Sequence, residues 1–223
     1  MEEYFNRQIQ LWGLEKQQSL QDKHIVIIGC GGLGCSLGIA LGASGIGKIT
    51  LVDFDEVGVH NIHRQIGFTT ADEGVKKSTA LKKLLESRCP YTEITAIDGS
   101  FEDFTSMNID VDLILDATDN LPTRASIDSY AKQSKTPWIY GSVEEFHGQI
   151  CYFDKASFAS SFQVTDRKPN GIACPIVMNI ASIQANLAIK FLIGDEVTKD
   201  TLYYFFYDEM GVINLQKFKL PTS

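Results

Sequence analysis

The glycine cluster GCGGLG at residues 29–34 constrains the fold of this chain more than any other sequence feature. An apolar, β-branched run (24–28) precedes it, and a segment of small residues (35–43) follows it. This order predicts a strand, a tight glycine turn and a helix. A second apolar run (49–52) ends at Asp53. This part of the sequence therefore predicts one βαβ unit with two parallel strands.

The rest of the chain first continues the alternation of strands and helices and then changes its rhythm. Further helices are predicted over 77–88, 124–133 and 176–192, and further strands over 93–98, 111–116, 138–140, 149–153, 202–207 and 212–218. The last two strands form a hairpin around residues 208–211. We therefore predict a Rossmann-like, doubly wound α/β fold whose mostly parallel sheet is extended by C-terminal antiparallel strands.

Charge and composition limit the classes of function. The 223 residues carry 20 Lys and Arg against 28 Asp and Glu, a formal net charge of −8. Nucleic acid is an unlikely partner, because surfaces that bind it need clustered cations to neutralise phosphates. Two long uncharged stretches (25–47 and 171–189) contain too many glycines or polar residues for membrane spans, so we expect interior elements of a soluble fold. The five cysteines are unclustered, and we expect reduced thiols in a cytoplasmic protein.

Gly29, Gly31 and Gly34 have the G-x-G-x-x-G spacing of nucleotide-binding turns. Glycines let the backbone approach a phosphate, and the N-terminus of the following helix offers free N–H groups. Asp53, about twenty residues further on, is placed to accept hydrogen bonds from ribose hydroxyls. These residues predict an adenosine-containing ligand, of which NAD is the commonest. A glycine turn without a ligand is the alternative.

Four further features do not fit a hydride-transfer enzyme. They are Arg7, the segment HNIHRQ (60–65) with Asn61 and Arg64, Lys77, and Asp119 in DATDN (116–120). Ligands of open α/β sheets bind outside the carboxyl ends of the strands, so Asp53, Arg64 and Asp119 are expected in one crevice. Two arginines, a lysine and a carboxylate around a nucleotide indicate triphosphate chemistry with Mg²⁺.

With these residues the sequence resembles the ThiF/MoeB/HesA family, relatives of the ubiquitin-activating enzymes. The resemblance rests on six motifs in this order: RQIQLWG, GCGGLG, LVDFDEV, NIHRQ, GVKK and DATDN. They lie within residues 4–194. The resemblance implies ATP-dependent adenylation of the C-terminal Gly-Gly carboxylate of a small ubiquitin-like sulfur carrier protein, with release of pyrophosphate. The ThiS type of carrier is favoured, and the MoaD type comes next.

The resemblance also implies roles for residues of a nucleotide-binding core (21–145). Gly32 lies against the nucleotide, and Asp53 binds its ribose. Asn61 and Arg64 contact the ribose and the phosphates, and Lys77 contacts phosphate oxygens. The catalytic residues implied by the resemblance are Arg7, Arg64, Lys77 and Asp119.

A second set of implied roles concerns the metal and the partners. Asp119 ligates Mg²⁺, and Asn120 lies beside it near the adenine. Arg7, in an N-terminal helix (1–20), reaches the γ-phosphate of the ATP bound to a partner subunit, which implies a homodimer. The C-terminal part (146–223) binds the carrier, and all parts belong to a single domain.

The sequence departs from the family pattern in its cysteines. Many members carry two Cys-x-x-Cys pairs that bind structural zinc, and this chain has neither, so no such zinc is expected. Cys174 is the only thiol near the position of the cysteine that forms a covalent carrier intermediate in some members. We expect Cys174 to be buried and inert rather than a nucleophile. Residues 156–170 are expected to form a mobile loop over the carrier tail.

Other interpretations stay open beside these roles. Asp119 would also fit as the cap of the following helix, and Asp116 as a structural hydrogen-bond acceptor. Arg7 and Arg64 would also fit as solvated side chains without a functional role. Three other functions fit parts of the sequence: adenylation of another acceptor such as a tRNA base, a non-catalytic subunit of a heterodimeric activating enzyme, and a dehydrogenase. The net charge counts against RNA, the full set of site residues against a degenerate subunit, and the cation cluster against a dehydrogenase.

Overall fold

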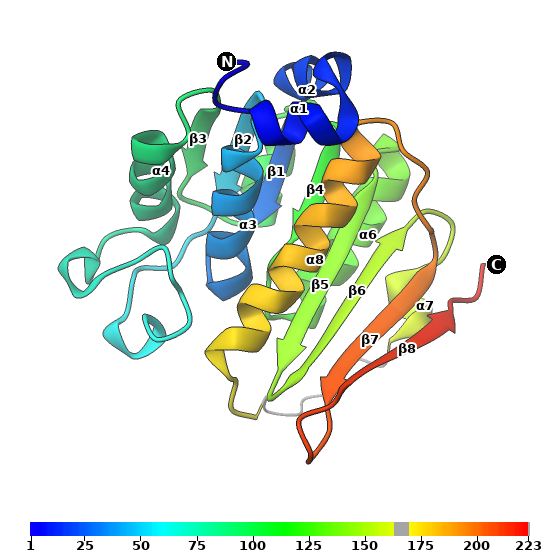
Figure 1. Cartoon of the computed structure of the whole chain (residues 1–223). Coiled ribbons are helices and arrows are strands. Elements are labelled where there is room, and N and C mark those ends of the chain that lie inside the picture. The colour runs from blue at the N-terminus through cyan, green and yellow to red at the C-terminus, as the bar shows by residue number, and fades with distance from the viewer. Residues whose placement is uncertain (163–169, 223) are drawn as a thin grey trace.

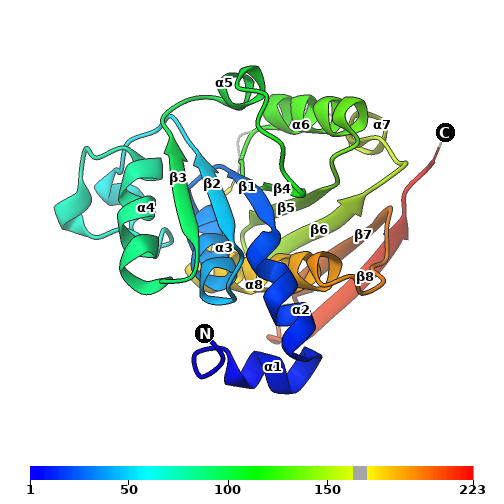
Figure 2. The same ribbon diagram turned by 90° about the horizontal axis from the view of Figure 1, so that it is seen from above.

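The computed structural model of the chain describes residues 1–162 and 170–222. Within these residues, one eight-stranded sheet lies between two layers of helices (Figures 1 and 2). The strands are β1 His24–Ile28, β2 Lys48–Val52, β3 Glu93–Ile97, β4 Leu113–Asp116, β5 Trp138–Glu144, β6 His147–Phe153, β7 Thr201–Tyr207 and β8 Ile213–Lys219. The helices are α1 Asn6–Trp12, α2 Leu14–Ser19, α3 Gly32–Ala43, α4 Lys77–Arg88, α5 Phe101–Ser106, α6 Leu121–Ser134, α7 Phe158–Ser161 and α8 Cys174–Leu192.

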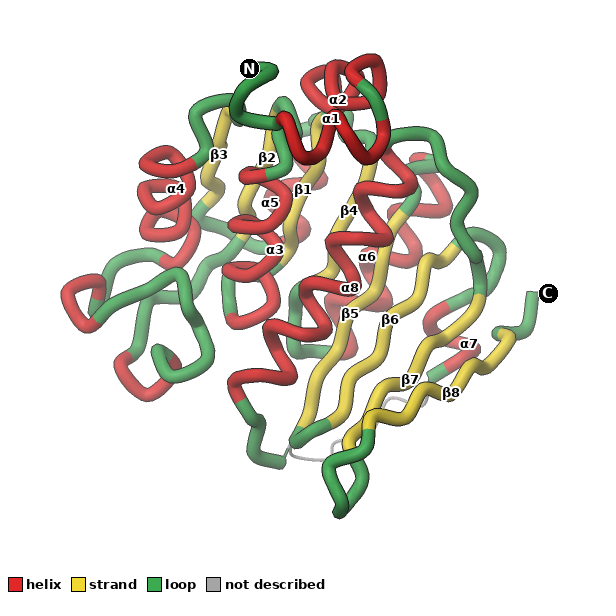
Figure 3. Tube along the Cα trace, in the orientation of Figure 1, coloured by secondary structure: helices red, strands yellow, loops and turns green. Residues whose placement is uncertain are grey.

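The strand order in the sheet is β3-β2-β1-β4-β5-β6-β7-β8. β1 to β5 are parallel, and β5 to β8 are antiparallel neighbours, as the path of the chain in Figure 3 shows. The predicted fold class is therefore confirmed, including the C-terminal hairpin of β7 and β8. The main difference in length concerns β5 and β6, which are longer than predicted because they pair with each other up to Glu144 and His147.

Alternating side chains along the central strands build a core on each face of the sheet. Ile25 and Ile27 of β1 belong to the cluster covered by α3, α4 and α8, whereas Val26 and Ile28 belong to the cluster covered by α5, α6 and α7. Successive side chains of a strand point to opposite faces, so a strand that is covered on both faces must be apolar throughout. None of these four side chains is more than 3% exposed.

The long helix α8 packs inside the fold. Its length and mean hydropathy of 1.3 would suit a membrane-spanning helix. However, Val177, Ile180 and Ala188 are buried in the core cluster on the α3 side of the sheet. The polar residues Ser182 and Asn186 are exposed on its other face. The prediction of an interior element for this stretch is therefore confirmed.

The N-terminal region differs from the prediction of one helix over residues 1–20. Gly13 has a positive φ of 89° and separates α1 from α2, so the region forms two short helices. The helix α5 was not predicted from the sequence. It begins with a capping box in which Ser100 and Asp103 satisfy each other's backbone N–H groups.

The segment 156–170 is not a loop throughout, contrary to the prediction. Its first part forms α7, in which Phe158 is fully buried and packs near Trp138. Residues 163–169, which form the middle of the predicted carrier-covering loop, lie outside the described residues.

Two buried carboxylates hold the segment that leads from β6 into α7. Asp128 of α6 accepts hydrogen bonds from the Ser157 hydroxyl (3.1 Å) and from the Phe158 N–H (3.0 Å). Asp200 accepts hydrogen bonds from the backbone N–H groups of residues 154–156, at 2.8, 3.1 and 3.1 Å. Burial acts to raise the pKa of Asp200, but these three N–H groups outweigh it and lower the pKa below its ordinary value.

We expect Asp200→Asn to lower the free energy of unfolding by about 1–3 kcal/mol at pH 7, because three N–H groups lose a charged acceptor. A carboxylate with a lowered folded-state pKa stabilises the fold only while it is ionised. The difference between the two proteins should therefore persist from pH 7 to about pH 4 and shrink as the pH falls further, through the folded-state pKa. Urea unfolding at several pH values measures both effects.

The matched control for this prediction is Asp154→Asn. Asp154 pairs with Lys199 at 3.3 Å on the surface, and such exposed pairs contribute about 0–1 kcal/mol. An equal loss of stability in both variants would contradict the structural role of Asp200.

Candidate functional site

The candidate site lies at the carboxyl ends of β1, β2 and β4. The sheet continues from β1 through β2 to β3 on one side and from β4 to β5 on the other, so the chain changes direction between β1 and β4. In open α/β sheets, ligands bind at such a switch point, outside the carboxyl ends of the strands. In Figure 1 this edge is the lower end of the central strands, where α3 and α8 begin.

The glycine turn between β1 and α3 (29–34) brings backbone segments into close contact. Gly29 has a φ of +94°, and a Cβ at this position would lie 2.7 Å from the carbonyl oxygen of Ala117, just beyond β4. A Cβ on Gly34 would overlap with the carbonyl oxygen of Gly29. Glycine is required at these two positions by the packing of the turn itself.

The two middle glycines of the motif face different surroundings. A Cβ on Gly31 would meet only Gln65 Nε2, at 3.5 Å, so the space beside Gly31 is otherwise open. A Cβ on Gly32 would lie 2.7 Å from Val177 Cγ1 of α8 and 3.1 Å from the carbonyl oxygen of Arg64. Protein atoms thus occupy the space in which a side chain at position 32 would lie. Gly32 can therefore offer a ligand only its backbone N–H.

Asp53 follows β2 and is fixed by two hydrogen bonds. Its carboxylate accepts one from the Cys30 N–H of the glycine turn (2.6 Å) and one from the Asp55 N–H (2.7 Å). Burial raises the pKa of Asp53, while these two N–H groups act in the opposite direction. Asp53 is therefore joined directly to the glycine turn, on the β2 side of the candidate site.

Lys77, the first residue of α4, is a buried cation. Its side chain is only 7% exposed, and Nζ lies 2.8 Å from Oδ2 of Asp55, whose side chain is 52% exposed. The Lys77 N–H also donates to the carbonyl oxygen of Asp55 (2.9 Å). Asp55 thus links Asp53 and Lys77, and a phosphate that approached Nζ would compete with the Asp55 carboxylate.

Asn61 and Arg64 lie in the loop between β2 and α4 and contact each other. Asn61 ends a short 3₁₀-helix (Val59–Asn61), and its Oδ1 accepts a hydrogen bond from Arg64 Nη2 (2.9 Å). Arg64 Nη1 lies 3.0 Å from His63 Nε2. Because the Arg64 carbonyl group packs against Gly32, this loop is held beside the glycine turn.

At the end of β4, Asp116 and Arg124 form a buried ion pair with 3.1 Å between Oδ2 and Nε. Asp116 also accepts hydrogen bonds from the N–H and the hydroxyl of Thr118, and Arg124 donates to the carbonyl oxygens of Thr118 and Gly141. Burial raises the pKa of Asp116, and Arg124 and Thr118 act against this rise. The interpretation of Asp116 as a structural acceptor is confirmed, and the pair fixes the loop that carries Asp119.

Asp119 is exposed, and its neighbour caps the helix that follows. Asn120 Oδ1 accepts a hydrogen bond from the Thr123 N–H (2.8 Å), so the capping role considered for Asp119 belongs to Asn120. Within residues 1–162 and 170–222, the Asp119 carboxylate forms no hydrogen bond or ion pair, and no group of three His, Cys, Asp or Glu residues could hold a metal ion. A single exposed carboxylate still suits Mg²⁺, which often takes one or two carboxylates and completes its shell with waters and phosphate oxygens.

Arg7 lies far from the crevice of its own chain. It belongs to α1, which packs against the C-terminal end of α3, where Gln8 Nε2 donates to the carbonyl oxygen of Ser44 (3.0 Å). The glycine turn is at the other end of α3, and this 12-residue helix is roughly 18 Å long. Arg7 is exposed, and α1, which carries it, lies at the end of α3 opposite to the glycine turn (Figure 1).

Cys174 is the first residue of α8 and is partly exposed, so the prediction that it is buried is wrong. The other four cysteines are buried. Burial raises the pKa of Cys35 and of Cys151 to about 12, which keeps both thiols protonated and unreactive at neutral pH. The side chain of Cys174 forms no hydrogen bond or ion pair over the described ranges.

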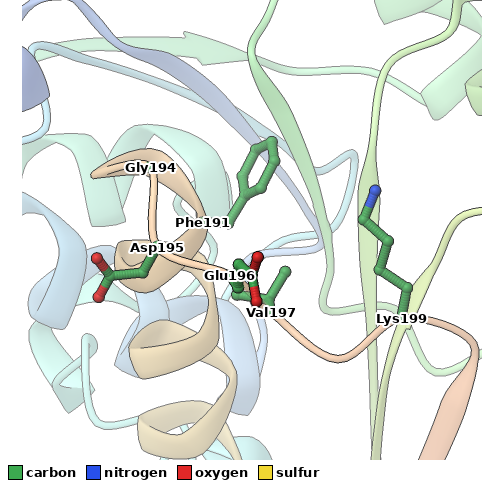
Figure 4. Close-up of a pocket in the computed structure, with 6 residues that line it drawn as sticks. All are labelled: Phe191, Gly194, Asp195, Glu196, Val197 and Lys199. Atoms are coloured by element: carbon green, nitrogen blue, oxygen red, sulfur yellow. The ribbon is translucent and has the colours of Figure 1, made fainter.

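A surface pocket of about 350 Å³ at the C-terminal end of α8 is separate from the crevice. It is lined by Phe191, Gly194, Asp195, Glu196, Val197 and Lys199 (Figure 4). Asp195 is already paired with Lys16 of α2 and with Lys190. Because α8 has 19 residues and is roughly 28 Å long, this pocket lies at the opposite edge of the sheet from the glycine turn.

Three residues of the site had no individual prediction. Asp55 and Gln65 stand inside the motifs LVDFDEV and NIHRQ, next to residues that were predicted, and this position was the available signal. Arg124 lies on a helix, and nothing in the sequence pattern indicates that this arginine is only 5% exposed.

Together the fold and the crevice define a Rossmann-type α/β protein with a glycine turn beside a lysine, an arginine and two carboxylates. Residues 5–223 match the ThiF family, and the chain belongs to this family. The family resemblance inferred from the motifs is therefore confirmed.

Relatives of known function are similar over most of the chain. The molybdopterin-synthase adenylyltransferase of Escherichia coli K12 is 32% identical over 203 residues, which cover 85% of this chain and 82% of the relative. The sulfur carrier protein ThiS adenylyltransferase of the same organism is 32% identical over 214 residues, which cover 90% and 85%. The adenylyltransferase and sulfurtransferase MOCS3 of Dictyostelium discoideum is 31% identical over 213 residues, and the chain spans about half (50%) of its length.

Solved structures share the fold. The Escherichia coli protein MccB with MccA-N7isoASN has a TM-score of 0.85 and 21% sequence identity, over 100% of this chain and 75% of MccB. PaaA has a TM-score of 0.84 and 21% identity, over 98% of this chain and 73% of PaaA. At this level of identity, the likeness concerns the fold alone.

We expect Gly34→Ala to destabilise the protein by about 1–3 kcal/mol, because the added methyl group would overlap with the carbonyl oxygen of Gly29. Gly31→Ala should cost clearly less, since its nearest neighbour, Gln65 Nε2 at 3.5 Å, leaves room for a methyl group. Thermal unfolding of the two variants measures the difference. Equal stability of both would show that the turn is not crowded at Gly34.

Proposed function

We propose that this protein is an adenylyltransferase that uses ATP to activate the C-terminal glycine carboxylate of a small ubiquitin-like sulfur carrier protein, of ThiS or MoaD type. The observation that carries the proposal is the set of contacts at the glycine turn, where Asp53 accepts a hydrogen bond from Cys30 and Lys77 is paired with the neighbouring Asp55. The loop that carries Arg64 packs against Gly32, and the loop that carries Asp119 packs against Gly29. The two Escherichia coli relatives, whose names describe adenylyltransferases for molybdopterin synthase and for the sulfur carrier ThiS, support the same chemistry.

In this proposal the phosphates of ATP lie at the first turn of α3, whose N–H groups have no acceptor within the helix. Asp53 accepts hydrogen bonds from the ribose hydroxyls, and Asn61 supports the ribose from the other side. Arg64 and Lys77 neutralise the phosphates, and Lys77 exchanges Asp55 for a phosphate oxygen. The dinucleotide turn of a dehydrogenase needs neither cation, which is why we favour a triphosphate.

The reaction needs no general base from the protein, because the carrier carboxylate is already an anion. One carboxylate oxygen forms a bond to the α-phosphorus of ATP. The bond from this phosphorus to the oxygen that bridges to the β-phosphate breaks, and pyrophosphate leaves with the electron pair. The chain contributes position and positive charge, which stabilise the charge that develops on the phosphates. Mg²⁺ held by Asp119, with Asn120 beside it near the adenine, would supply further screening of this charge.

We also propose a homodimer with two composite sites. Arg7 is exposed on α1, at the opposite end of α3 from its own glycine turn. Its side chain contacts Gln10 (3.3 Å) and makes no ion pair within the described part of the chain. This cation is therefore available to the γ-phosphate of ATP in a partner subunit, as the family resemblance implies.

We expect the protein to catalyse exchange of labelled pyrophosphate into ATP when a ThiS-type or MoaD-type carrier is present. Asp119→Ala should lower the exchange rate about 100-fold or more without lowering the melting temperature, because the side chain is exposed and holds the proposed metal. Asp110→Ala, which removes an exposed carboxylate before β4, is the control and should retain activity. Absence of exchange with every carrier tested would favour a non-catalytic subunit, and a fully active Asp119→Ala would remove the metal role.

The dimer makes a complementation test possible. Arg7→Ala and Asp119→Ala should each be inactive alone, because each variant damages both sites of its own homodimer. In a mixed dimer, one site combines the intact Arg7 of one subunit with the intact Asp119 of the other. Mixing the variants should therefore restore activity, at most to about one site per mixed dimer. Absence of recovery in a mixture shown to exchange subunits would count against an arginine acting in the partner's site.

A further inference from the structure

Gln65 is a buried residue whose side chain has no partner in the fold. It is only 4% exposed. Its backbone is satisfied, because the N–H donates to Asn61 and the carbonyl oxygen accepts from the Phe68 N–H, both at 3.1 Å. Over residues 1–162 and 170–222, however, Oε1 is buried without a hydrogen bond, and Nε2 donates to no protein group. Oε1 is an acceptor and cannot pair with an anion, so the inference rests on the donor Nε2, which has no acceptor among the described residues although the residue is only 4% exposed. Such donors are almost always paired, so a partner outside the protein is indicated.

The position of the amide shows where this partner would lie. Nε2 is 3.5 Å from the point that a Cβ of Gly31 would occupy, which is the open side of the glycine turn. Gly31 is the residue before α3, so the same space is bordered by the first N–H groups of that helix. A side-chain donor therefore lies beside the start of a helix, where the first backbone N–H groups have no acceptor within the helix, and that combination suits an oxyanion.

A second buried glutamine provides a contrast. Gln184 of α8 is also fully buried, but its Nε2 donates to the carbonyl oxygens of Asp116 (2.9 Å) and Ile139 (3.0 Å). It thereby bridges β4 and β5, and its donor is used for the fold. Oε1 of Gln184 is buried without a hydrogen bond, as is Oε1 of Gln65, so the two glutamines differ in their donors. The donor of Gln65 pairs with no group of the described residues and is available to a ligand.

We propose that Gln65 is a substrate-contacting residue whose Nε2 donates a hydrogen bond to a phosphate oxygen of the nucleotide at the glycine turn. This inference rests on the proposed function and extends it to a residue that the motif roles leave out. The phosphate is favoured over the carrier carboxylate because the donors of α3 and Gln65 converge at Gly31, on the proposed phosphate site.

The test is Gln65→Met, which keeps the length of the side chain and removes its donor. The dissociation constants of ATP and AMP, measured by calorimetry, should rise about 10-fold or more, since a hydrogen bond to a charged group is lost. The dissociation constant of adenosine, which has no phosphate, should change less than about 2-fold. The melting temperature should stay equal or rise, because an unpaired buried amide is replaced by an apolar group of similar shape. Loss with ATP alone would assign the contact to the β- or γ-phosphate, and loss with both to the α-phosphate.

Gln184→Met is the matched control. It removes two hydrogen bonds that the fold uses, so its melting temperature should fall by several degrees. A similar fall for Gln65→Met would show that Gln65 is structural and would overturn the inference. Unchanged affinity for ATP, or equal weakening for adenosine, would overturn it as well. If the unchanged protein binds neither ATP nor AMP, the proposed function itself fails. If the unchanged protein and Gln65→Met bind both nucleotides equally well, only the role of Gln65 fails.

Discussion

The close approach of β1 to the segment that follows β4 is the constraint on which the whole crevice depends. At Gly29 there is no room for a side chain beside the Ala117 carbonyl group, and at Gly34 there is none beside Gly29. This contact brings the loop with Asp119 next to the start of α3. The hydrogen bond from Cys30 to Asp53 then adds the end of β2. Three loops from separate parts of the sequence thus meet at one turn of backbone, before any side chain acts on a ligand.

The charges around this turn are balanced in two different ways. The carboxylate that pairs with Lys77 belongs to Asp55 and is half exposed, so water can solvate it when a phosphate takes its place. The carboxylate that pairs with Arg124 belongs to Asp116 and is fully buried, and removal of either partner would leave an uncompensated charge in the interior. Lys77 can therefore exchange its carboxylate partner for a phosphate, which suits ligand binding. The pair of Asp116 and Arg124 stays intact and supports the loop that follows β4.

The sheet and most of the candidate site could be predicted because their signals are local. Apolar runs, glycines at fixed spacing and polar residues at strand ends depend on neighbours in the sequence. The burial of Arg124, the exposure of Cys174 and the packing of Phe158 depend on elements far away in the chain, so no pattern revealed them. The break at Gly13 was missed because a single glycine does not exclude a helix, and only the φ of 89° decides it. For Arg7 the family resemblance already implies a role in a partner subunit, and the packing of α1 against the end of α3 adds that Arg7 lies away from its own glycine turn.

The contact of Val177 with Gly32 has a consequence for how the protein acquires its shape. The two residues are roughly 145 positions apart, and such distant contacts slow folding because a long loop must close before they form. While the ribosome is still making the C-terminal third, the glycine turn has no α8 to lie against and keeps part of its apolar surroundings in water. The chain is therefore most exposed to aggregation when its N-terminal two thirds have been made and α8 has not.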